Sequence, residues 1–137
     1  MSECIFCKIV GGEIPAVKVY EDDQVLAFMD INPLNNGHTL IIPKKHAETI
    51  LEIDPDELAA VMKTAQRIAQ AIQKALNPDG ITVIQLNRRA AGQVIPHLHV
   101  HLIPRWEGDE LQISRWEPVA GDMEKIKEIG AKIKAEL

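Results

Sequence analysis

Three of the five histidines, His97, His99 and His101, occupy every second position of one stretch, with Leu98 and Val100 between them. In an extended strand, residues i, i+2 and i+4 lie on one face. The spacing therefore predicts three imidazoles on one side of a strand and apolar side chains entering a core on the other. Imidazole has the unperturbed pKa nearest to neutrality, so it can serve as a base, a nucleophile or a metal ligand. The stretch predicts a chemical site.

A second reactive pair lies near the N-terminus, where Cys4 and Cys7 are separated by two residues. A structural disulfide is not expected in a reducing compartment. The spacing leaves three alternatives, which are a redox pair, half of a metal site, or two buried small side chains. Tetrahedral zinc needs four ligands, of which the cysteines supply two.

The composition describes the background against which these groups act. A chain of 137 residues is long enough for one domain (1–137) with a real core. The net charge of -5, with scattered basic residues, argues against a nucleic-acid polymer as partner but not against a mononucleotide. No apolar run approaches the ~20 residues of a membrane span, and the N-terminus lacks the pattern of a signal peptide. We therefore expect a cytoplasmic protein that does not enter a membrane.

The elements that must position these groups follow from the periodicity. They are expected to be a short helix over 4–10, a hairpin over 18–29, a strand over 38–43, a long helix over 54–76, a strand over 81–86, the histidine strand, and a C-terminal helix over 123–137 that Gly130 weakens. Neighbouring strands joined by short turns favour an antiparallel sheet, so the predicted class is α+β. A sheet of about five strands leaves an edge that must be covered or paired, and a symmetric dimer would do this.

The segment 92–105, GQVIPHLHVHLIPR, resembles the signature of the histidine triad family. The upstream segments that also match are CIFCKI at 4–9, GEIP at 12–15, LAFMDI at 26–31 and GHTLIIPKKH at 37–46. The resemblance extends over about 4–105, is greatest to the bacterial nucleoside phosphoramidases, and leaves 106–137 as a C-terminal extension. It implies an α+β fold and a homodimer whose sheets join, binding a purine mononucleotide such as AMP or GMP.

The resemblance also implies an activity, which is hydrolysis of nucleoside 5′-phosphoramidates through a covalent nucleotidyl-histidine. His99 would be the nucleophile, His97 and His101 would flank it, and His38 would support its ring. A neutral imidazole can attack phosphorus with one nitrogen when the other carries the proton, and a carbonyl can fix that tautomer. The covalent intermediate splits one difficult displacement into two easier ones. This scheme requires no metal at the phosphate.

The resemblance further implies a set of nucleotide contacts. Asp30 would hold the ribose hydroxyls, while His101, Gln93 and backbone N–H groups around Gly92 and Val94 would supply donors to the phosphoryl oxygens. The side chains expected around the base are Phe28, Ile31, Phe6, Ile5, Ile14 and Leu40.

Two positions depart from the family pattern. Leu86 stands where many relatives carry Asn or Gln, and Val94 stands where many carry Ser or Thr. Asn87 is expected to take over the polar role of the first position. Arg88 and Arg89 replace a loop that often contains glycine, and they are expected to be solvated surface charges.

The resemblance also extends the cysteine pair to a zinc site. Bacterial relatives with this start often hold structural zinc, and the ligands here would be Cys4, Cys7, His46 and His97. Four nitrogen and sulfur ligands form a closed site, which leaves His99 free for chemistry.

Three other functions use the same residues. His97, His99 and His101 could hold a catalytic metal with a bound hydroxide, as in a metal-dependent hydrolase. The chain could be a non-catalytic nucleotide-binding regulator. It could also be a dinucleoside polyphosphate hydrolase or nucleotidyltransferase of the same superfamily, which would differ in the leaving group.

Overall fold

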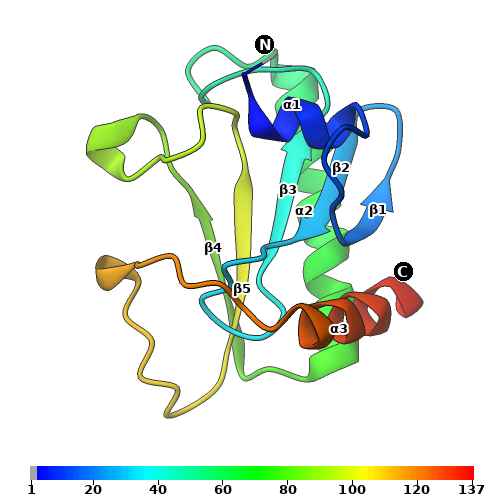
Figure 1. Cartoon of the computed structure of the whole chain (residues 1–137), viewed down its shortest axis with the longest axis vertical. Helices are drawn as coiled ribbons and strands as arrows, with labels where there is room; N and C mark the ends of the chain where they lie inside the picture. The colour runs from blue at the N-terminus through cyan, green and yellow to red at the C-terminus, as the bar shows by residue number, and fades with distance from the viewer. Residues whose placement is uncertain (1–2) are drawn as a thin grey trace.

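The computed structural model describes residues 3–137, apart from the side chain of Arg115. Five strands form one antiparallel sheet in the order β1-β2-β3-β5-β4 (Figure 1). The strands are β1 (Lys18–Glu21), β2 (Val25–Met29), β3 (Thr39–Pro43), β4 (Gly80–Gln85) and β5 (Val100–Arg105). This confirms the predicted α+β class with a five-stranded antiparallel sheet.

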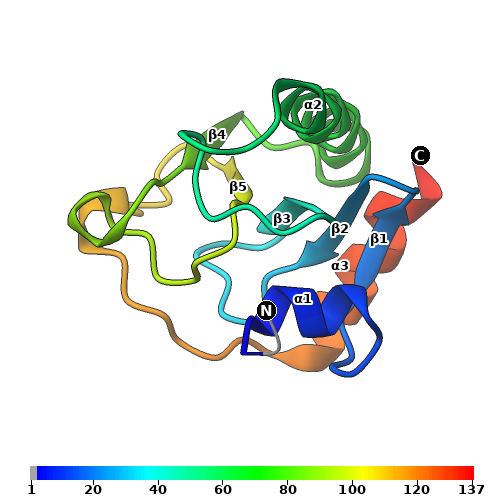
Figure 2. The same cartoon turned by 90° about the horizontal axis from the view of Figure 1, so that it is seen from above.

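Helices lie on both sides of the sheet (Figure 2). They are α1 (Ile5–Val10), α2 (Pro55–Leu76) and α3 (Met123–Ala135), with short 3₁₀ turns η1 (Arg89–Ala91) and η2 (Ile113–Arg115). The long helix α2 begins where the Asp54 carboxylate accepts the N–H of Asp56 at 2.8 Å, which satisfies one of the free donors of the first turn. It ends at Asn77, whose φ of 50° is left-handed.

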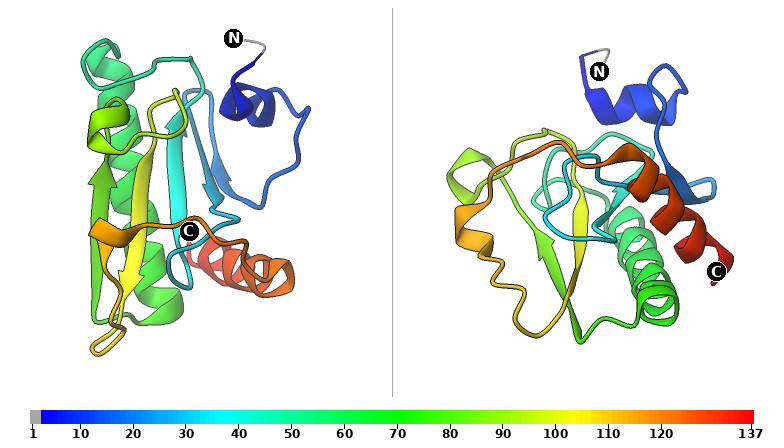
Figure 3. Two further views of the ribbon diagram at one scale, coloured as in Figure 1. Left: turned by 60° about the vertical axis from the view of Figure 1, so that its left-hand side comes forward. Right: turned by 60° about the horizontal axis from the view of Figure 1, so that its bottom comes forward.

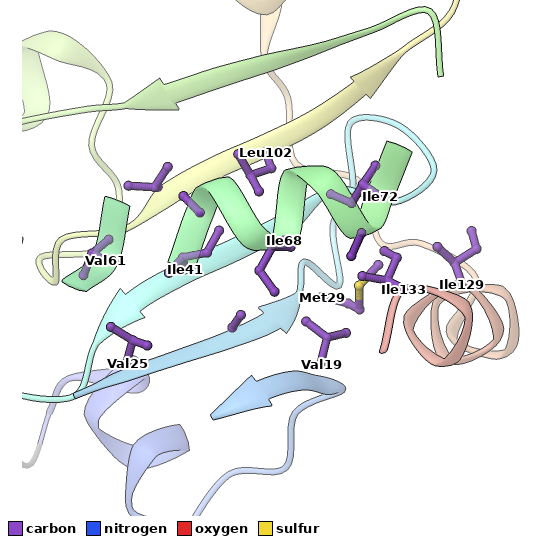
Figure 4. Packing of buried hydrophobic residues seen from close by; sticks show 14 of the residues in the cluster. Val19, Val25, Met29, Ile41, Val61, Ile68, Ile72, Leu102, Ile129 and Ile133 are labelled. Carbon is purple, nitrogen blue, oxygen red and sulfur yellow. The ribbon is translucent and has the colours of Figure 1, made fainter. Parts of the chain in front are cut away.

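The main core lies between the sheet and helices α2 and α3 (Figure 4). Strand alternation sends one set of side chains to this face, and the apolar faces of the two helices cover it. Members of this core include Val25, Ala27, Ile41, Val100, Leu102, Ile68, Ile72, Ile129 and Ile133. Within residues 3–137, none of the helices combines the length and apolarity that crossing a bilayer needs.

Gly130 lets α3 approach the sheet closely. A Cβ atom at this position would lie 2.9 Å from Cγ1 of Val17 and 3.1 Å from Cγ of Met29. Both distances are shorter than an ordinary carbon–carbon contact. The residue that lowers the helical propensity of this segment therefore sets how closely the helix packs.

The opposite face of the sheet carries a second apolar cluster under α1. Phe28 of β2 pairs with Leu40 of β3, which pairs with His101 of β5, so these three residues form one row across the sheet. The C-terminal segment between β5 and α3 crosses in front of this face (Figures 1 and 3). The histidine side of the sheet therefore lies between α1 and this segment.

The histidine strand is shorter than predicted, because β5 begins at Val100 and not at His97. Pro96 has no N–H to give to a neighbouring strand, and the N–H of Leu98 binds the carbonyl of Ala47 at 2.8 Å. The alternation nevertheless continues, since Leu98 is fully buried in the helix-side core. His97 lies in a bend, where its N–H binds the carbonyl of Ile95 at 2.8 Å, His99 follows before the strand begins, and only His101 lies in the strand.

Candidate active site

His99 is held in one tautomer by the backbone. Its Nδ1 lies 2.7 Å from the carbonyl oxygen of His97, which can only accept, so Nδ1 carries the proton. Burial lowers the pKa of His99, and the ring is neutral near pH 7. Its Nε2 has no hydrogen-bond partner among residues 3–137, yet every fully buried polar side-chain atom there has one. The Nε2 lone pair is therefore accessible from the open side of the sheet.

A chain of hydrogen bonds fixes the tautomers of two further histidines. The N–H of Leu34 donates to Nδ1 of His38 at 3.0 Å, so neutral His38 carries its proton on Nε2. That nitrogen lies 3.0 Å from Nδ1 of His101 and donates to it, which leaves the proton of His101 on its own Nε2. Burial lowers the pKa of His38 to about 3 and that of His101 to about 2, and repulsion from His99, when that ring is protonated, adds to both shifts. His101 is thus a neutral donor with Nε2 free among the described residues.

Asp30 supplies a carboxylate beside these rings. Its Oδ1 accepts the N–H of Asn32 at 2.8 Å, and its Oδ2 lies 3.5 Å from Nε2 of His38. Burial raises the pKa of Asp30, while the Asn32 N–H and the charge of His99 lower it. The same pairing favours the charged form of His99. The carboxylate can therefore stabilise positive charge that develops on the His99 ring during an attack.

The predicted base-contacting residues divide into a buried group and an exposed group. Phe6 lies edge-on to both Phe28 and His99, with ring centroids 5.4 Å and 5.1 Å apart. Phe6, Phe28 and Leu40 are buried in the α1-side cluster, and Ile14 packs against it. Ile5 and Ile31 are instead about half exposed, at 45% and 54%. The buried group forms an apolar surface beside His99, and the exposed pair is open to contact with a ligand.

Gln93 has backbone partners for all its side-chain hydrogen-bonding groups. Its Oε1 accepts the N–H of Arg88 at 2.6 Å, and its Nε2 donates to the carbonyls of Glu48 at 2.7 Å and Ile95 at 3.0 Å. The structure thus uses this buried amide to hold the 87–95 loop, and the phosphate contact expected from the sequence stays a prediction. The exposed Val94 has an N–H without a partner among the described residues, which is a free donor at this loop.

The Asn87 side chain connects two loops through hydrogen bonds. Its amide exchanges hydrogen bonds with that of Gln85 at 2.9 Å and 2.8 Å, and its Oδ1 accepts the N–H of Ile50 at 2.7 Å. Gln85 pairs with Val100, whose side chain enters the helix-side core. Asn87 shares the strand parity of Gln85, so it continues the face opposite to His101. Its role as a nucleotide contact stays a prediction.

The four predicted metal ligands, Cys4, Cys7, His46 and His97, come together in one cluster. Nδ1 of His97 lies 3.3 Å from Sγ of Cys4 and 3.6 Å from Sγ of Cys7, which is 3.2 Å from Nδ1 of His46. Zn–S bonds of about 2.3 Å and Zn–N bonds of about 2.0–2.1 Å at a tetrahedral angle separate sulfur and nitrogen by about 3.6 Å. The donor set and its spacing therefore fit zinc.

The orientation of His97 suits it to a metal rather than to a phosphate. Its Nε2 donates to the carbonyl of Pro43 at 2.8 Å, which leaves the Nδ1 lone pair toward the two sulfurs. A carbonyl behind a ligating imidazole is the usual support of such a ligand. Burial raises the pKa of Cys7 to about 11, and the neighbouring Cys4 contributes a smaller part of this increase. A bound cation would reverse this effect by favouring the thiolate.

Trp116 packs against two of the histidines. Its ring is T-shaped to His101, with centroids 4.6 Å apart, and tilted to His38 at 5.6 Å. It comes from the C-terminal segment that crosses the open face (Figure 3). Sequence reasoning also missed the backbone partners, namely the Leu34 N–H and the Pro43 carbonyl, because backbone groups carry no residue-type signal.

Comparison with known proteins places the chain in a family. The HIT domain model matches residues 11–108. The chain belongs to the HIT family. This superfamily contains nucleotide-binding proteins and hydrolases, and many of its members are dimers.

Solved structures and curated proteins resemble the chain over most of its length. A HIT-like protein involved in cell-cycle regulation from Bartonella henselae, solved with an unknown ligand, has a TM-score of 0.93 and 47% identity, covering 100% of this chain and 98% of that one. A zinc-bound histidine triad family protein from Mycobacterium smegmatis has a TM-score of 0.86 and 36% identity, covering 98% and 93%. Adenylylsulfatase HINT3 from Arabidopsis thaliana is 48% identical over 113 residues, which are 82% of this chain and 57% of that protein.

Proposed function

We propose that the protein is a nucleoside phosphoramidase that hydrolyses adenosine 5′-phosphoramidates and related purine nucleotides, such as those of GMP, through a nucleotidyl-His99 intermediate. The single observation that supports this is the state of His99. Its Nδ1–H is fixed on the carbonyl of His97, while its Nε2 is unprotonated and has no partner among the described residues. An imidazole in this state is a nucleophile ready for phosphorus.

In the proposed first step, Nε2 of His99 bonds to phosphorus and the phosphorus–nitrogen bond of the substrate breaks. The leaving nitrogen keeps the electron pair of the broken bond, takes up one proton from water and departs as an amine. The Nε2–H of His101 and the N–H of Val94 donate to the phosphoryl oxygens, and Asp30 balances the positive charge of the His99 ring. Water then attacks phosphorus, the bond between phosphorus and Nε2 of His99 breaks, and AMP, neutral His99 and one proton are released.

The nucleoside is proposed to lie on the α1 side of the sheet. The base rests on the apolar surface that includes Phe6 and Phe28, and Asp30 accepts hydrogen bonds from the ribose hydroxyls. Ile5 and Ile31 cover the base from the rim, where they are half exposed without a ligand. Leu40 and Ile14 complete the apolar wall.

A bound zinc ion would be structural in this scheme, supplying a crosslink between the N-terminal segment and the sheet. Cys4, Cys7, His46 and His97 would hold it. The His97 ring would then be fixed on the metal side while its carbonyl holds His99. The relative from Mycobacterium smegmatis, whose structure is zinc-bound, supports this assignment.

The test follows AMP release from adenosine 5′-phosphoramidate by the full-length protein. We expect release from wild type, persistence after chelation under conditions that keep the fold, and loss in His99→Ala. A His46→Ala variant is the matched control, because it removes a histidine from the metal cluster and leaves the nucleophile. Loss of release on chelation would favour the metal-dependent hydrolase, and AMP binding without any release would favour the nucleotide-binding regulator.

A second candidate uses the same intermediate with another leaving group. The relative named adenylylsulfatase, with 48% identity, favours cleavage of adenosine 5′-phosphosulfate, in which a phosphorus–oxygen bond breaks and sulfate leaves. Measuring kcat/KM for the phosphoramidate and the phosphosulfate in one assay decides between them. Dinucleoside polyphosphates belong in the same comparison, because they share the adenylyl group.

We also propose that the protein works as a homodimer in the cytoplasm. Strand β4 is an edge of the sheet, and its Val83 is 53% exposed. An apolar edge strand is a site for pairing with another chain. We expect light scattering to give the mass of a dimer for wild type and of a monomer for Val83→Lys.

A further inference from the structure

Arg88 has a backbone conformation that arginine rarely adopts. Its φ is 72° and its ψ is 164°, which lies in a region that is essentially restricted to glycine. Such a conformation persists only when the surroundings impose it. Here the N–H of Arg88 donates to Oε1 of Gln93 at 2.6 Å, and its carbonyl accepts the N–H groups of Ala91 at 3.1 Å and Gln93 at 3.0 Å. A glycine would satisfy this loop with less strain.

The strain is not explained by the solvated surface charge that the sequence predicted. A surface charge could occupy any neighbouring position of the loop, including that of Arg89, at no backbone cost. Strained residues are concentrated at functional sites, where the side chain is needed in one place. The backbone strain at Arg88 therefore indicates a role for its guanidinium group.

The position of the loop suggests what the guanidinium meets. Strands β2 and β3 carry the proposed base contacts, and β5 carries His101. The next strand in the sheet is β4, where Ile84 pairs with His101. The loop with Arg88 follows β4 directly and returns to the histidines. With the nucleoside over β2 and β3 as proposed, this loop is on the opposite side of His101, which is the side we assign to the leaving group.

The charge on this loop is unneutralised. Arg88 is exposed and forms no ion pair among the described residues, whereas Arg105 is engaged by Asp109 at 2.8 Å. A guanidinium is always charged and binds planar oxyanions with two hydrogen bonds. A loop with an unpaired guanidinium should bind a negatively charged leaving group more tightly than a neutral leaving group of equal size.

We propose that Arg88 selects substrates whose leaving group carries an anionic oxygen group, a specificity that rests on the proposed nucleotidyl-transfer function. The reaction is unchanged, because Nε2 of His99 bonds to phosphorus and the leaving atom departs with the electron pair of the broken bond. The amine form takes up one proton from water. Arg88 contacts the oxyanion of the leaving group and does not act on phosphorus.

The test uses two isosteric substrates, the adenosine 5′-phosphoramidates of glycine and of glycinamide, which differ by a carboxylate. The readout is the ratio of their kcat/KM values, so that general effects on the site cancel. For Arg88→Ala we expect this ratio to fall about tenfold, the worth of one charge-assisted hydrogen bond. Arg88→Lys should keep part of the preference, and added salt should reduce it in wild type.

Two further variants separate strain from charge. Arg88→Gly should lose the preference as Arg88→Ala does, and should also melt a few degrees higher than wild type because the strain is relieved. Arg89→Ala is the matched control, since it removes the same charge from the next residue and should keep the ratio. An unchanged ratio in Arg88→Ala, or an equal fall in Arg89→Ala, would overturn the assignment.

The outcomes also distinguish this inference from the proposed function. Cleavage of the glycinamide compound by wild type supports the phosphoramidase whatever the ratio is. If wild type cleaves neither compound, the proposed function is wrong, and calorimetric titration with the same pair still tests the Arg88 contact. Equal affinity for both compounds in that titration would refute it. Adenosine 5′-phosphosulfate, run beside them, shows whether a sulfate is preferred to a carboxylate.

Discussion

The hydrogen-bonded pair of His38 and His101 should make the protein unstable in mild acid. Burial lowers the pKa of His38 to about 3 and that of His101 to about 2, while both groups titrate near the ordinary value of about 6.5 in the unfolded chain. Above that value both histidines are neutral in the folded and the unfolded chain, so they make no contribution to the pH dependence of the free energy of unfolding. Below it the unfolded chain binds protons that the folded chain does not, so stability is lost as the pH falls toward the folded pKa values.

The magnitude follows from linkage. Each histidine removes about 1.4 kcal/mol of stability per pH unit below 6.5, so that the pair removes about 4 kcal/mol between pH 7 and pH 5. This is a large part of the ~5–15 kcal/mol that holds an ordinary domain together. Urea unfolding at pH 7, 6 and 5, followed by circular dichroism, measures the loss.

The variant His101→Asn isolates one member of the pair. Its side-chain oxygen can accept the Nε2–H of His38 in place of the ring nitrogen, while one titrating group disappears. We expect the loss between pH 7 and pH 5 to be smaller than in wild type by about 2 kcal/mol. Leu102→Ala is the control, because it lowers stability equally at each pH. Both variants are compared with wild type at the same zinc content. If His101→Asn keeps the full wild-type loss, or if nitrogen NMR shows His101 titrating above pH 5, the assignment of neutral tautomers is wrong.

Three further predictions concern the metal cluster, the relay and the core. Cys7→Ser should weaken zinc binding and lower the melting temperature, which metal analysis and calorimetry measure. An unchanged zinc content and melting temperature would contradict the four-ligand centre. His38→Ala should lower kcat for adenosine 5′-phosphoramidate by about 10–100-fold, with a smaller change in KM. The substitution removes the donor that fixes the proton of His101 on Nε2. An unchanged kcat would exclude a role for the His38–His101 hydrogen bond. Gly130→Ala should reduce the free energy of unfolding by about 1–3 kcal/mol in urea, because the added methyl meets Val17 and Met29, and a gain in stability would show that α3 can move outward.

The sequence predicts the elements of this fold well because most of them have strong local signals. Asp54 and Pro55 mark the start of α2, and apolar periodicity continues to its end. The five-stranded sheet follows from short strands and turns. The start of β5 was predicted too early, because alternation of side chains does not require ladder hydrogen bonds. The chain bends at Pro96, and the Leu98 N–H binds the carbonyl of Ala47 outside the sheet, so the ladder begins only at Val100.

The site is predicted less completely, because its important partners are backbone atoms. Residue types and spacing select the histidines and cysteines, which the structure brings together in two clusters. They do not reveal that the side-chain amide of Gln93 donates hydrogen bonds to the carbonyls of Glu48 and Ile95. They also do not reveal the backbone strain at Arg88, since a glycine-only conformation is visible only once φ and ψ are known.

His97 shows how one residue can serve both clusters without taking part in both chemistries. Its ring faces the cysteines through Nδ1 and is braced by Pro43 through Nε2, so that neither nitrogen is available to a phosphate. Its carbonyl holds the Nδ1 proton of His99 and thereby leaves Nε2, the proposed nucleophile, unprotonated. The metal cluster and the His99 ring are therefore linked through a single residue. A metal on the cysteine side would hold the ring of the residue whose carbonyl holds His99, which is consistent with a structural ion and with the proposed displacement at phosphorus, in which the metal takes no part.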